Sequence, residues 1–274
     1  MKLELKKFDI SKIKDDKVIV FIGKRGTGKS FLVKDLLYYH TDLPIGTVIS
    51  GTESANKFYG DFVPNVFIHE EVNPELIDNV IKRQKLIMKK LNNEKKTYGH
   101  SRIDPRTFLI LDDCLYDGSW AKDKNIRAIF MNGRHLKMFF IITMQYPLGI
   151  PPNLRTNIDY VFILRENIVG NRKRIYENYA GMFPNFEIFT QVMDQCTENY
   201  ECLVIDNTSS SNRLEDCVYW YKASEHENYK IGANQFWINN EEQEDELDEE
   251  EVFDMERFKN KKKNATKINV HKFN

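Results

Sequence analysis

The chain has 274 residues, of which 41% are hydrophobic and 30% are charged, and its formal net charge is −1. This composition supports a folded core in one large domain, or in one domain with an appendage. No apolar run approaches the roughly 18 residues of a membrane span, the N-terminal MKLELKK lacks the apolar segment of a signal peptide, and the cysteines form no C-x-x-C pair. A soluble protein of a reducing compartment is therefore expected, and membrane-spanning and secreted classes are excluded.

A phosphate-binding motif follows the first predicted strand. Residues 23–30 read GKRGTGKS and fit G-x-x-x-x-G-K-[ST], between an apolar strand at 17–22 and a helix at 31–39. In such a strand–loop–helix, backbone N–H groups and the helix N-terminus face the phosphates of a nucleotide. Lys29 is expected to reach the β- and γ-phosphates, and the Ser30 hydroxyl to help hold Mg²⁺. The predicted nucleotide-binding residues are Gly23, Lys24, Arg25, Gly26, Thr27, Gly28, Lys29, Ser30 and Phe31.

Short apolar runs alternate with helical segments further along the chain. We predict strands at 46–50 and 66–69, and then a long helix from Pro74 to about Asn93. Apolar runs separated by helices are typical of a parallel sheet with right-handed crossovers, so we expect an α/β fold with a mostly parallel central sheet flanked by helices. Lysines crowd one side of the long helix, and that side is either a solvated face or a surface for DNA or another subunit.

Two carboxylates follow the apolar strand at 108–111. The sequence FLILDD brings Asp112 and Asp113 to the carboxyl edge of the sheet, beside the expected position of the phosphates. Asp112 is predicted to hold the Mg²⁺ shell, directly or through water. Asp113 is placed to orient or deprotonate the attacking water, a role that hydrolysis needs more than nucleotide binding does. The alternative role for Asp113 is a cap at the end of the strand.

A third apolar strand, at 138–144, ends in Gln145. An amide at this place is predicted to sense the γ-phosphate or position water, and the alternative is a turn residue at the strand end. Arg134 precedes this strand and Arg155 follows it. A guanidinium group suits the charge that spreads during phosphoryl transfer. Either arginine is therefore a candidate finger for the site of a neighbouring subunit, against the simpler role of a surface or sheet-edge arginine.

The C-terminal end of the chain is strongly polarised in charge. Residues 241–251 (EEQEDELDEEE) hold nine acidic residues and no basic one, and residues 252–274 hold seven Lys or Arg against two acidic residues. A block of like charge with few apolar side chains does not bury enough surface to repay its ordering. We predict a folded domain over 1–240 and a flexible charged tail over 241–274. The tail is either a solvated extension or a nucleic-acid contact with which the acidic block competes.

These residues by themselves support a nucleoside triphosphatase with basic surfaces, and two other classes stay open. A nucleotide or nucleoside kinase also uses a phosphate loop, and Arg172-Lys173-Arg174 could serve as its arginine-rich lid. Adjacent carboxylates and a strand that ends in glutamine fit the activation of water better than the recognition of a small acceptor. The other class is a non-hydrolysing protein that regulates through bound nucleotide, and the pair Asp113 and Gln145 argues against it.

Four parts of the chain, taken in order, are more specific than any single motif. They are GKRGTGKS, FLILDD, GRHLKMFFIITMQYP with PPNLRTNIDYVFILR, and YECLVIDNTSSSNRLEDCVYWYKA. Together they resemble the DNA-packaging ATPases of nucleocytoplasmic large DNA viruses and virophages, which belong to the HerA–FtsK superfamily. The resemblance covers about 17–223 and implies a RecA-like fold. It places Lys29, Ser30, Asp112, Asp113 and Gln145 at the loop, metal, base and sensor positions, although a glutamate is common where Asp113 stands.

The resemblance also implies what the hydrolysis cycle does. It implies an ATP-hydrolysing motor that uses Mg²⁺ and moves double-stranded DNA into a viral capsid. A homo-oligomeric ring, either a pentamer or a hexamer, and a capsid or portal component are the implied partners. The expected location is the host cytoplasm, in the viral factory, with the virion as a second location.

Overall fold

The computed structural model describes residues 3–114, 120 and 122–238. The chain divides into two compact units, Met1–Ala233 and Asn234–Asn274. Residues 234–238 of the second unit are helical. The predicted domain boundary after residue 240 and the predicted charged tail lie outside the described residues, and both stay predictions.

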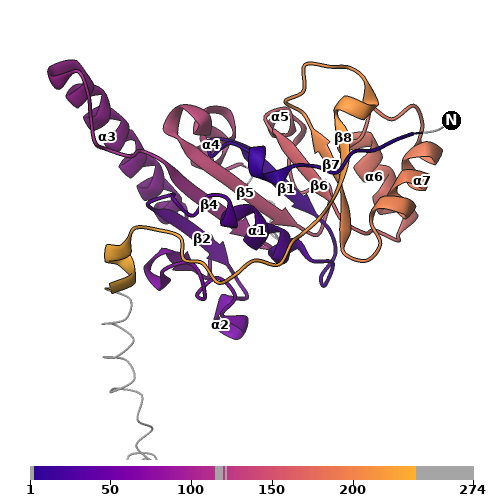
Figure 1. Ribbon diagram of the computed structural model, residues 1–274, viewed down its shortest axis with the longest axis horizontal. Helices are drawn as coiled ribbons and strands as arrows, with labels where there is room; N and C mark the ends of the chain where they lie inside the picture. Colours follow the sequence, from indigo (N-terminus) through magenta and orange to yellow (C-terminus); the bar gives the residue numbers. More distant parts are fainter. Residues whose placement is uncertain (1–2, 115–119, 121, 239–274) are drawn as a thin grey trace, which may run out of the picture. The chain divides into compact units, whose positions relative to one another are not determined.

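A single eight-stranded sheet forms the centre of the first unit, in the order β3-β2-β4-β5-β1-β6-β7-β8 (Figure 1). The pairs from β3 to β6 are all parallel, and β7 and β8 add antiparallel strands at one end. The predicted α/β fold with a mostly parallel sheet is therefore confirmed. The strands are β1 Val18–Ile22, β2 Gly46–Ser50, β3 Ile68–His69, β4 Thr107–Asp112, β5 Met138–Met144, β6 Tyr160–Ile163, β7 Glu201–Asp206 and β8 Val218–Lys222.

Helices lie between the strands and leave the central strands no exposed face. Strands β1, β2, β4, β5 and β6 are buried along their whole length, as expected for parallel strands that are covered on both sides. The helices are α1 Lys29–Tyr38, α2 Glu53–Asn56, α3 Pro74–Tyr98, α4 Lys124–Asn132, α5 Pro152–Arg155, α6 Val169–Tyr179 and α7 Phe186–Cys196, and the 3₁₀ turns are η1 Ile10–Lys12, η2 Asn65–Phe67, η4 Gly133–Leu136 and η5 Leu214–Asp216.

Several predicted boundaries shift by one or two residues, and two elements differ more clearly in length. Helix α3 continues to Tyr98 instead of ending near Asn93, because no helix breaker occurs before Gly99, which closes the helix in a left-handed conformation (φ 76°). Figure 1 shows this helix projecting away from the sheet. The strand expected at 66–69 is shorter, since its first half forms η2 and only Ile68–His69 pairs with β2.

Residues 223–233, which we call the C-terminal strap, run from the end of β8 back past α1 (Figure 1). On α1 the buried Asp35 carboxylate contacts the imidazole of His226 at 2.5 Å. The hydroxyl of Tyr229 donates a hydrogen bond to the Lys34 carbonyl at 2.6 Å. The strap therefore fixes the helix that begins at the phosphate loop.

Candidate nucleotide-binding site

The phosphate loop connects β1 to α1 over residues 23–28. Gly26 and Gly28 have φ angles of 76° and 101°, in the region that side chains rarely adopt, and Gly28 directly precedes α1. Gly23 is needed for a different reason: a Cβ there would lie 2.8 Å from the Leu164 Cβ, so the loop packs tightly on the chain that follows β6. The predicted strand–loop–helix is therefore present, with its backbone at the N-terminus of α1.

The ammonium group of Lys29 joins the loop to the acidic pair. Lys29 is 5% exposed, and its Nζ donates to the Gly23 carbonyl at 2.9 Å. The same Nζ lies 3.1 Å from Asp113 Oδ2. A buried cation needs such partners, and this arrangement holds its charge between the loop and the end of β4.

The acidic pair is held by Thr143, a residue that the sequence patterns did not single out. Asp112 is the last residue of β4 and lies opposite Thr143 of β5 in the parallel register. The Thr143 hydroxyl donates to Asp112 Oδ1 at 2.6 Å, and the Asp113 N–H donates to the same hydroxyl oxygen at 3.0 Å. Asp113 itself has φ 48°, an uncommon left-handed conformation. The sequence feature that could have identified Thr143 is the presence of a threonine within the otherwise apolar strand MFFIITM.

Gln145 contacts the second carboxylate, and its predicted sensor role stays a prediction. Its Nε2 donates to Asp113 Oδ2 at 3.1 Å, the oxygen that Lys29 also contacts. Gln145 is exposed at the carboxyl end of β5. Lys29 and Gln145, from separate elements, therefore converge on one oxygen atom of Asp113.

The carboxylates fit a divalent cation. Burial raises the pKa of Asp112, and the Thr143 hydrogen bond only partly offsets this effect. Asp113 Oδ1 is buried and has no hydrogen-bonding partner among the described residues. The described residues contain no cluster of three or more His, Cys, Asp or Glu that could hold a metal ion. Mg²⁺ is usually bound by one or two carboxylates together with phosphate oxygens and water, so the number of carboxylates present suits this ion. Half-buried Ser30, the second residue of α1, is the other predicted ligand.

Tyr59 borders the acidic pair, Glu53 holds the loop that carries Tyr59, and sequence reasoning singled out neither residue. Tyr59 is fully buried, and its hydroxyl lies beside the Asp112 carboxylate. Burial and then the charge of Asp112 raise the pKa of this phenol. The Glu53 carboxylate accepts hydrogen bonds from the N–H groups of Tyr59 (3.0 Å) and Gly60 (2.8 Å) and so fixes the loop.

The other predicted loop residues face outward or support the loop. Lys24 Nζ lies 2.9 Å from Glu166 Oε1, and the Thr27 hydroxyl donates to the Lys24 carbonyl at 2.7 Å. Arg25 and Phe31 are exposed. These two side chains are therefore accessible to a ligand that lies on the loop.

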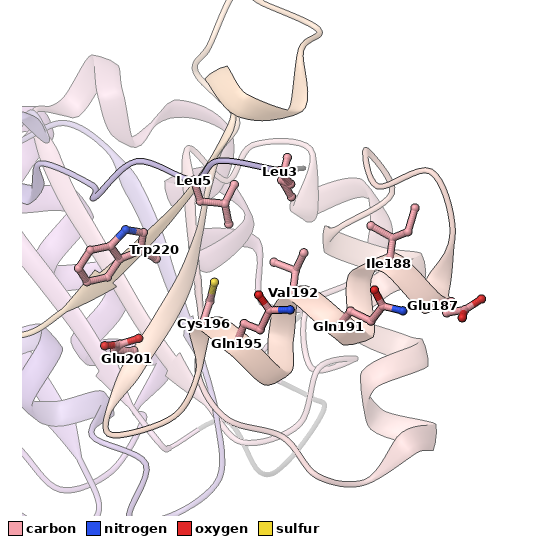
Figure 2. A pocket seen from close by; sticks show the side chains of 10 residues that line it. All are labelled: Leu3, Leu5, Glu187, Ile188, Gln191, Val192, Gln195, Cys196, Glu201 and Trp220. Carbon is pink, nitrogen blue, oxygen red and sulfur yellow. The ribbon is translucent and has the colours of Figure 1, made fainter. Parts of the chain in front are cut away.

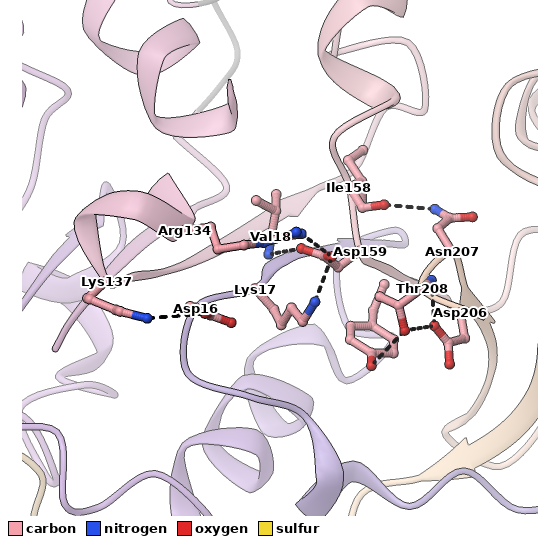
Figure 3. A network of polar contacts seen from close by, with 11 residues as sticks. Asp16, Lys17, Val18, Arg134, Lys137, Ile158, Asp159, Asp206, Asn207 and Thr208 are labelled. Carbon is pink, nitrogen blue, oxygen red and sulfur yellow. Dashed lines mark hydrogen bonds and ion pairs between the residues drawn. The ribbon is translucent and has the colours of Figure 1, made fainter. Parts of the chain in front are cut away.

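The two candidate arginine fingers lie near the amino ends of strands, at the edge of the sheet opposite the phosphate loop. Arg134 Nη2 lies 3.0 Å from Asp159 Oδ1, and the same carboxylate accepts hydrogen bonds from Lys17 Nζ (3.1 Å) and the Val18 N–H (2.9 Å) (Figure 3). Arg155 donates to Asn178 Oδ1. Neither contacts its own phosphate loop, so a finger role for either would act on a neighbouring subunit and stays a prediction.

The candidate kinase lid is part of the packing of α6. Arg172 is largely buried, and its Nη2 lies 2.6 Å from Asp194 Oδ1 on α7. Arg174 lies over the ring of Tyr146, with its Cζ 5.7 Å from the ring centroid. The arginine pattern that suggested a lid is thus used to hold neighbouring segments together.

A cavity of about 680 Å³ lies between the N-terminal segment and α7 (Figure 2). Cys196 and Trp220 line it together with apolar and polar side chains. None of the predicted site residues borders it. Its lining residues are Leu3, Leu5, Glu187, Ile188, Gln191, Val192, Gln195, Cys196, Glu201 and Trp220.

The fold and the site define a class. A phosphate loop after β1, an aspartate pair at the end of β4 and a glutamine after β5, with β5 lying between β1 and β4, are the features of a RecA-like P-loop nucleoside triphosphatase fold.

The chain belongs to the family described as Poxvirus A32 protein, which matches residues 5–235. It is 43% identical to a protein of Acanthamoeba polyphaga mimivirus over 236 residues, which cover 86% of this chain and 82% of that protein. It is 42% identical to a protein of Invertebrate iridescent virus 6 over 222 residues, which cover 80% and 82% of the two chains. The family resemblance inferred from the sequence is therefore confirmed.

Solved structures share the fold at low sequence identity. The genome packaging NTPase B204 from Sulfolobus turreted icosahedral virus 2, in complex with ATP-gammaS, aligns with a TM-score of 0.52 and 16% identity, over 77% of this chain and 98% of B204. The conjugation coupling protein TcpA of pCW3 aligns with a TM-score of 0.54 and 13% identity, over 84% and 65% of the two chains. No helix within the described residues is long and apolar enough to cross a membrane.

Proposed function

We propose that this protein is an ATP-hydrolysing motor that translocates double-stranded DNA into a viral capsid. The observation that carries the proposal is the convergence of Lys29 and Gln145 on Asp113 Oδ2 beside the phosphate loop. A carboxylate and an amide at that point suit the activation of water, which hydrolysis needs. The viral relatives and the genome packaging NTPase of similar fold support the proposal that ATP hydrolysis drives the packaging of DNA.

Each residue has one role in the proposed hydrolysis. The N–H groups of the loop and the ammonium group of Lys29 bind the β- and γ-phosphates of ATP. Asp113 takes the proton of the attacking water, and the Gln145 amide orients that water toward the γ-phosphate. Ser30 and Asp112 would hold Mg²⁺, which neutralises charge on the β- and γ-oxygens when bound.

The partners follow from charge and from the position of the arginines. Lys85, Lys89 and Lys96 are exposed on α3, they lie on one side of the helix at spacings of four and seven residues, and no ion pair engages them within the described residues. We propose that this lysine stripe contacts DNA phosphates, and that a homo-oligomeric ring, a pentamer or a hexamer, brings Arg134 or Arg155 to a neighbour's site. A capsid or portal component would receive the DNA, in the viral factory of the host cytoplasm and in the virion.

The test is the ATPase rate with and without long double-stranded DNA, with Lys29→Ala as the inactive control. We expect inorganic phosphate as the product and a higher rate when duplex DNA is added. Transfer of phosphate to an added nucleoside or nucleotide would instead identify a kinase. Tight ATP binding without any turnover would identify a regulatory protein.

A further inference from the structure

A second cavity opens directly beside the phosphate loop. Its volume is about 210 Å³. Three parts of the chain form its walls: the loop itself, the residue two positions after β6, and the turn before β7. The lining residues are Gly26, Thr27, Arg165, Thr197, Asn199 and Tyr200.

The position of this cavity relative to Lys29 sets which end of a nucleotide can reach it. Strand β1 lies between β5 and β6. Lys29, Asp113 and Gln145 meet on the β5 side, which is where the terminal phosphate must lie for attack by water. A triphosphate on the loop therefore directs its other end toward β6, where Arg165 and the cavity lie.

The size and the lining suit a nucleobase. Pockets for whole drug-sized ligands measure about 300–1,000 Å³, so this cavity accommodates one ring system better than a complete nucleotide. Tyr200 is 67% exposed, and its Cδ1 lies 3.4 Å from where a Cβ on Gly28 would stand, so an aromatic ring borders the loop. Arg165 is exposed, and no ion pair or hydrogen bond occupies its guanidinium group within the described residues.

The backbone that presents these side chains is unusual. Asn199 and Tyr200 are consecutive and have φ angles of 51° and 64°. Left-handed conformations are uncommon for non-glycine residues, cost free energy, and cluster at ligand sites. The conformation leaves the Tyr200 ring exposed beside the loop and places the Asn199 amide, with both donors and an acceptor, at the cavity.

We propose that this cavity holds the purine base of the bound nucleoside triphosphate. The Tyr200 ring stacks on the base, and Asn199 and Arg165 supply polar contacts to its edge. The proposal rests on the proposed function, because it requires that the phosphate loop binds a nucleoside triphosphate. It adds a nucleoside subsite that makes the base, and not only the phosphates, contribute to affinity.

The test compares ATP with inorganic tripolyphosphate, which has the phosphates but no base. Equilibrium binding to the full chain is measured with Mg²⁺ for Tyr200→Ala, Tyr200→Phe and the control Tyr98→Ala, whose ring is 71% exposed on α3. Loss of base–aromatic stacking should weaken ATP binding by about ten- to a hundredfold. We expect this loss of ATP affinity only in Tyr200→Ala, whereas Tyr200→Phe should keep the affinity of the unaltered protein. The affinity for tripolyphosphate should be unchanged in all variants.

The outcomes separate the subsite from the proposed function. Equal weakening of ATP and tripolyphosphate in Tyr200→Ala would show that the ring merely supports the loop and would overturn the base assignment. Unchanged ATP affinity in Tyr200→Ala would overturn it as well, while leaving the proposed ATPase intact. Failure of the unaltered protein to bind either ligand in a manner that depends on Lys29 would overturn the proposed function itself.

Discussion

Asp113 Oδ2 accepts contacts from a cation and from an amide, and its partner oxygen Oδ1 is buried without a hydrogen bond within the described residues. One carboxylate thus contacts both Lys29, which we propose binds the phosphates, and Gln145, which we propose senses the γ-phosphate. This arrangement lets single substitutions test two proposed functions separately, because Lys29 is proposed to bind the phosphates and Asp113 to activate the attacking water.

Lys29→Ala and Asp113→Asn should therefore fail differently. Lys29→Ala removes the cation at the phosphates and should lose both ATP binding and turnover. Asp113→Asn leaves the loop intact, so it should bind ATP with Mg²⁺ but hydrolyse it about 10²- to 10⁴-fold more slowly. Binding titrations and single-turnover rates measure the two effects. Near-normal turnover in Asp113→Asn would move the base role to Gln145.

The buried Asp112 carboxylate should lower the stability of the protein when no cation is bound. Burial raises the pKa of this carboxyl in the folded state, so its contribution to stability is greatest at low pH and is lost as the pH rises through the folded value. Without Mg²⁺ or nucleotide near neutral pH, Asp112→Asn should unfold at a higher temperature, by about 2–4 °C for each kcal/mol regained. The gain should shrink as the pH falls. Thermal unfolding at several pH values measures this, and a lower Tm at neutral pH would contradict it.

At the scale of elements, the lysine stripe of α3 gives a measurable prediction. Replacing Lys85, Lys89 and Lys96 with Gln should weaken duplex DNA binding without regard to sequence. The slope of log K against log salt should fall in magnitude by about 0.9 for each DNA phosphate that the variant no longer neutralises. A triple Lys→Gln variant at Lys14, Lys122 and Lys124 changes the net charge equally and is the control. If both triple variants bind duplex DNA equally weakly, the lysine stripe acts only through the net charge of the protein and is not a DNA-binding surface.

Sequence patterns predicted the parts of the site that lie within single segments. Apolar runs predicted β1, β4 and β5 because buried parallel strands are continuously apolar, and the motifs placed Lys29, Asp112 and Gln145 at strand or helix ends. Thr143 and Tyr59 could not be predicted in the same way. Thr143 matters because it lies opposite Asp112 in the register between β4 and β5. Tyr59 matters because its hydroxyl lies beside Asp112, and both relations arise only from the tertiary structure.

At the scale of the whole molecule, the arginines test assembly. Arg134→Ala or Arg155→Ala should lower turnover by about 10³- to 10⁵-fold without weakening ATP binding, if that arginine completes a neighbour's site. A mixture of this variant with Lys29→Ala subunits should regain partial activity, because some interfaces then pair an intact loop with an intact arginine. Unfolding temperatures of the single variants control for the removal of the bonds to Asp159 and Asn178. Mixtures as inactive as both parents, for both arginines, would exclude a role in trans.

The place of β1 in the middle of the sheet also determines when the protein can fold during synthesis. Residue 18 pairs with residue 140 on one side, and residue 19 pairs with residue 160 on the other. At the usual rate of translation, on the order of 10 s pass between the synthesis of the apolar segment VIVFI and the synthesis of β5 and β6, the strands with which it pairs. A chain ending at residue 137, before β5, should therefore aggregate or remain bound to chaperones, and it should not bind ATP. A chain ending at residue 233 should be soluble and should bind ATP. Soluble yield and ATP affinity of the two truncated chains measure this difference. The phosphate loop is made before the strands on both sides of β1, and it should therefore gain its shape only after residue 163 has left the ribosome.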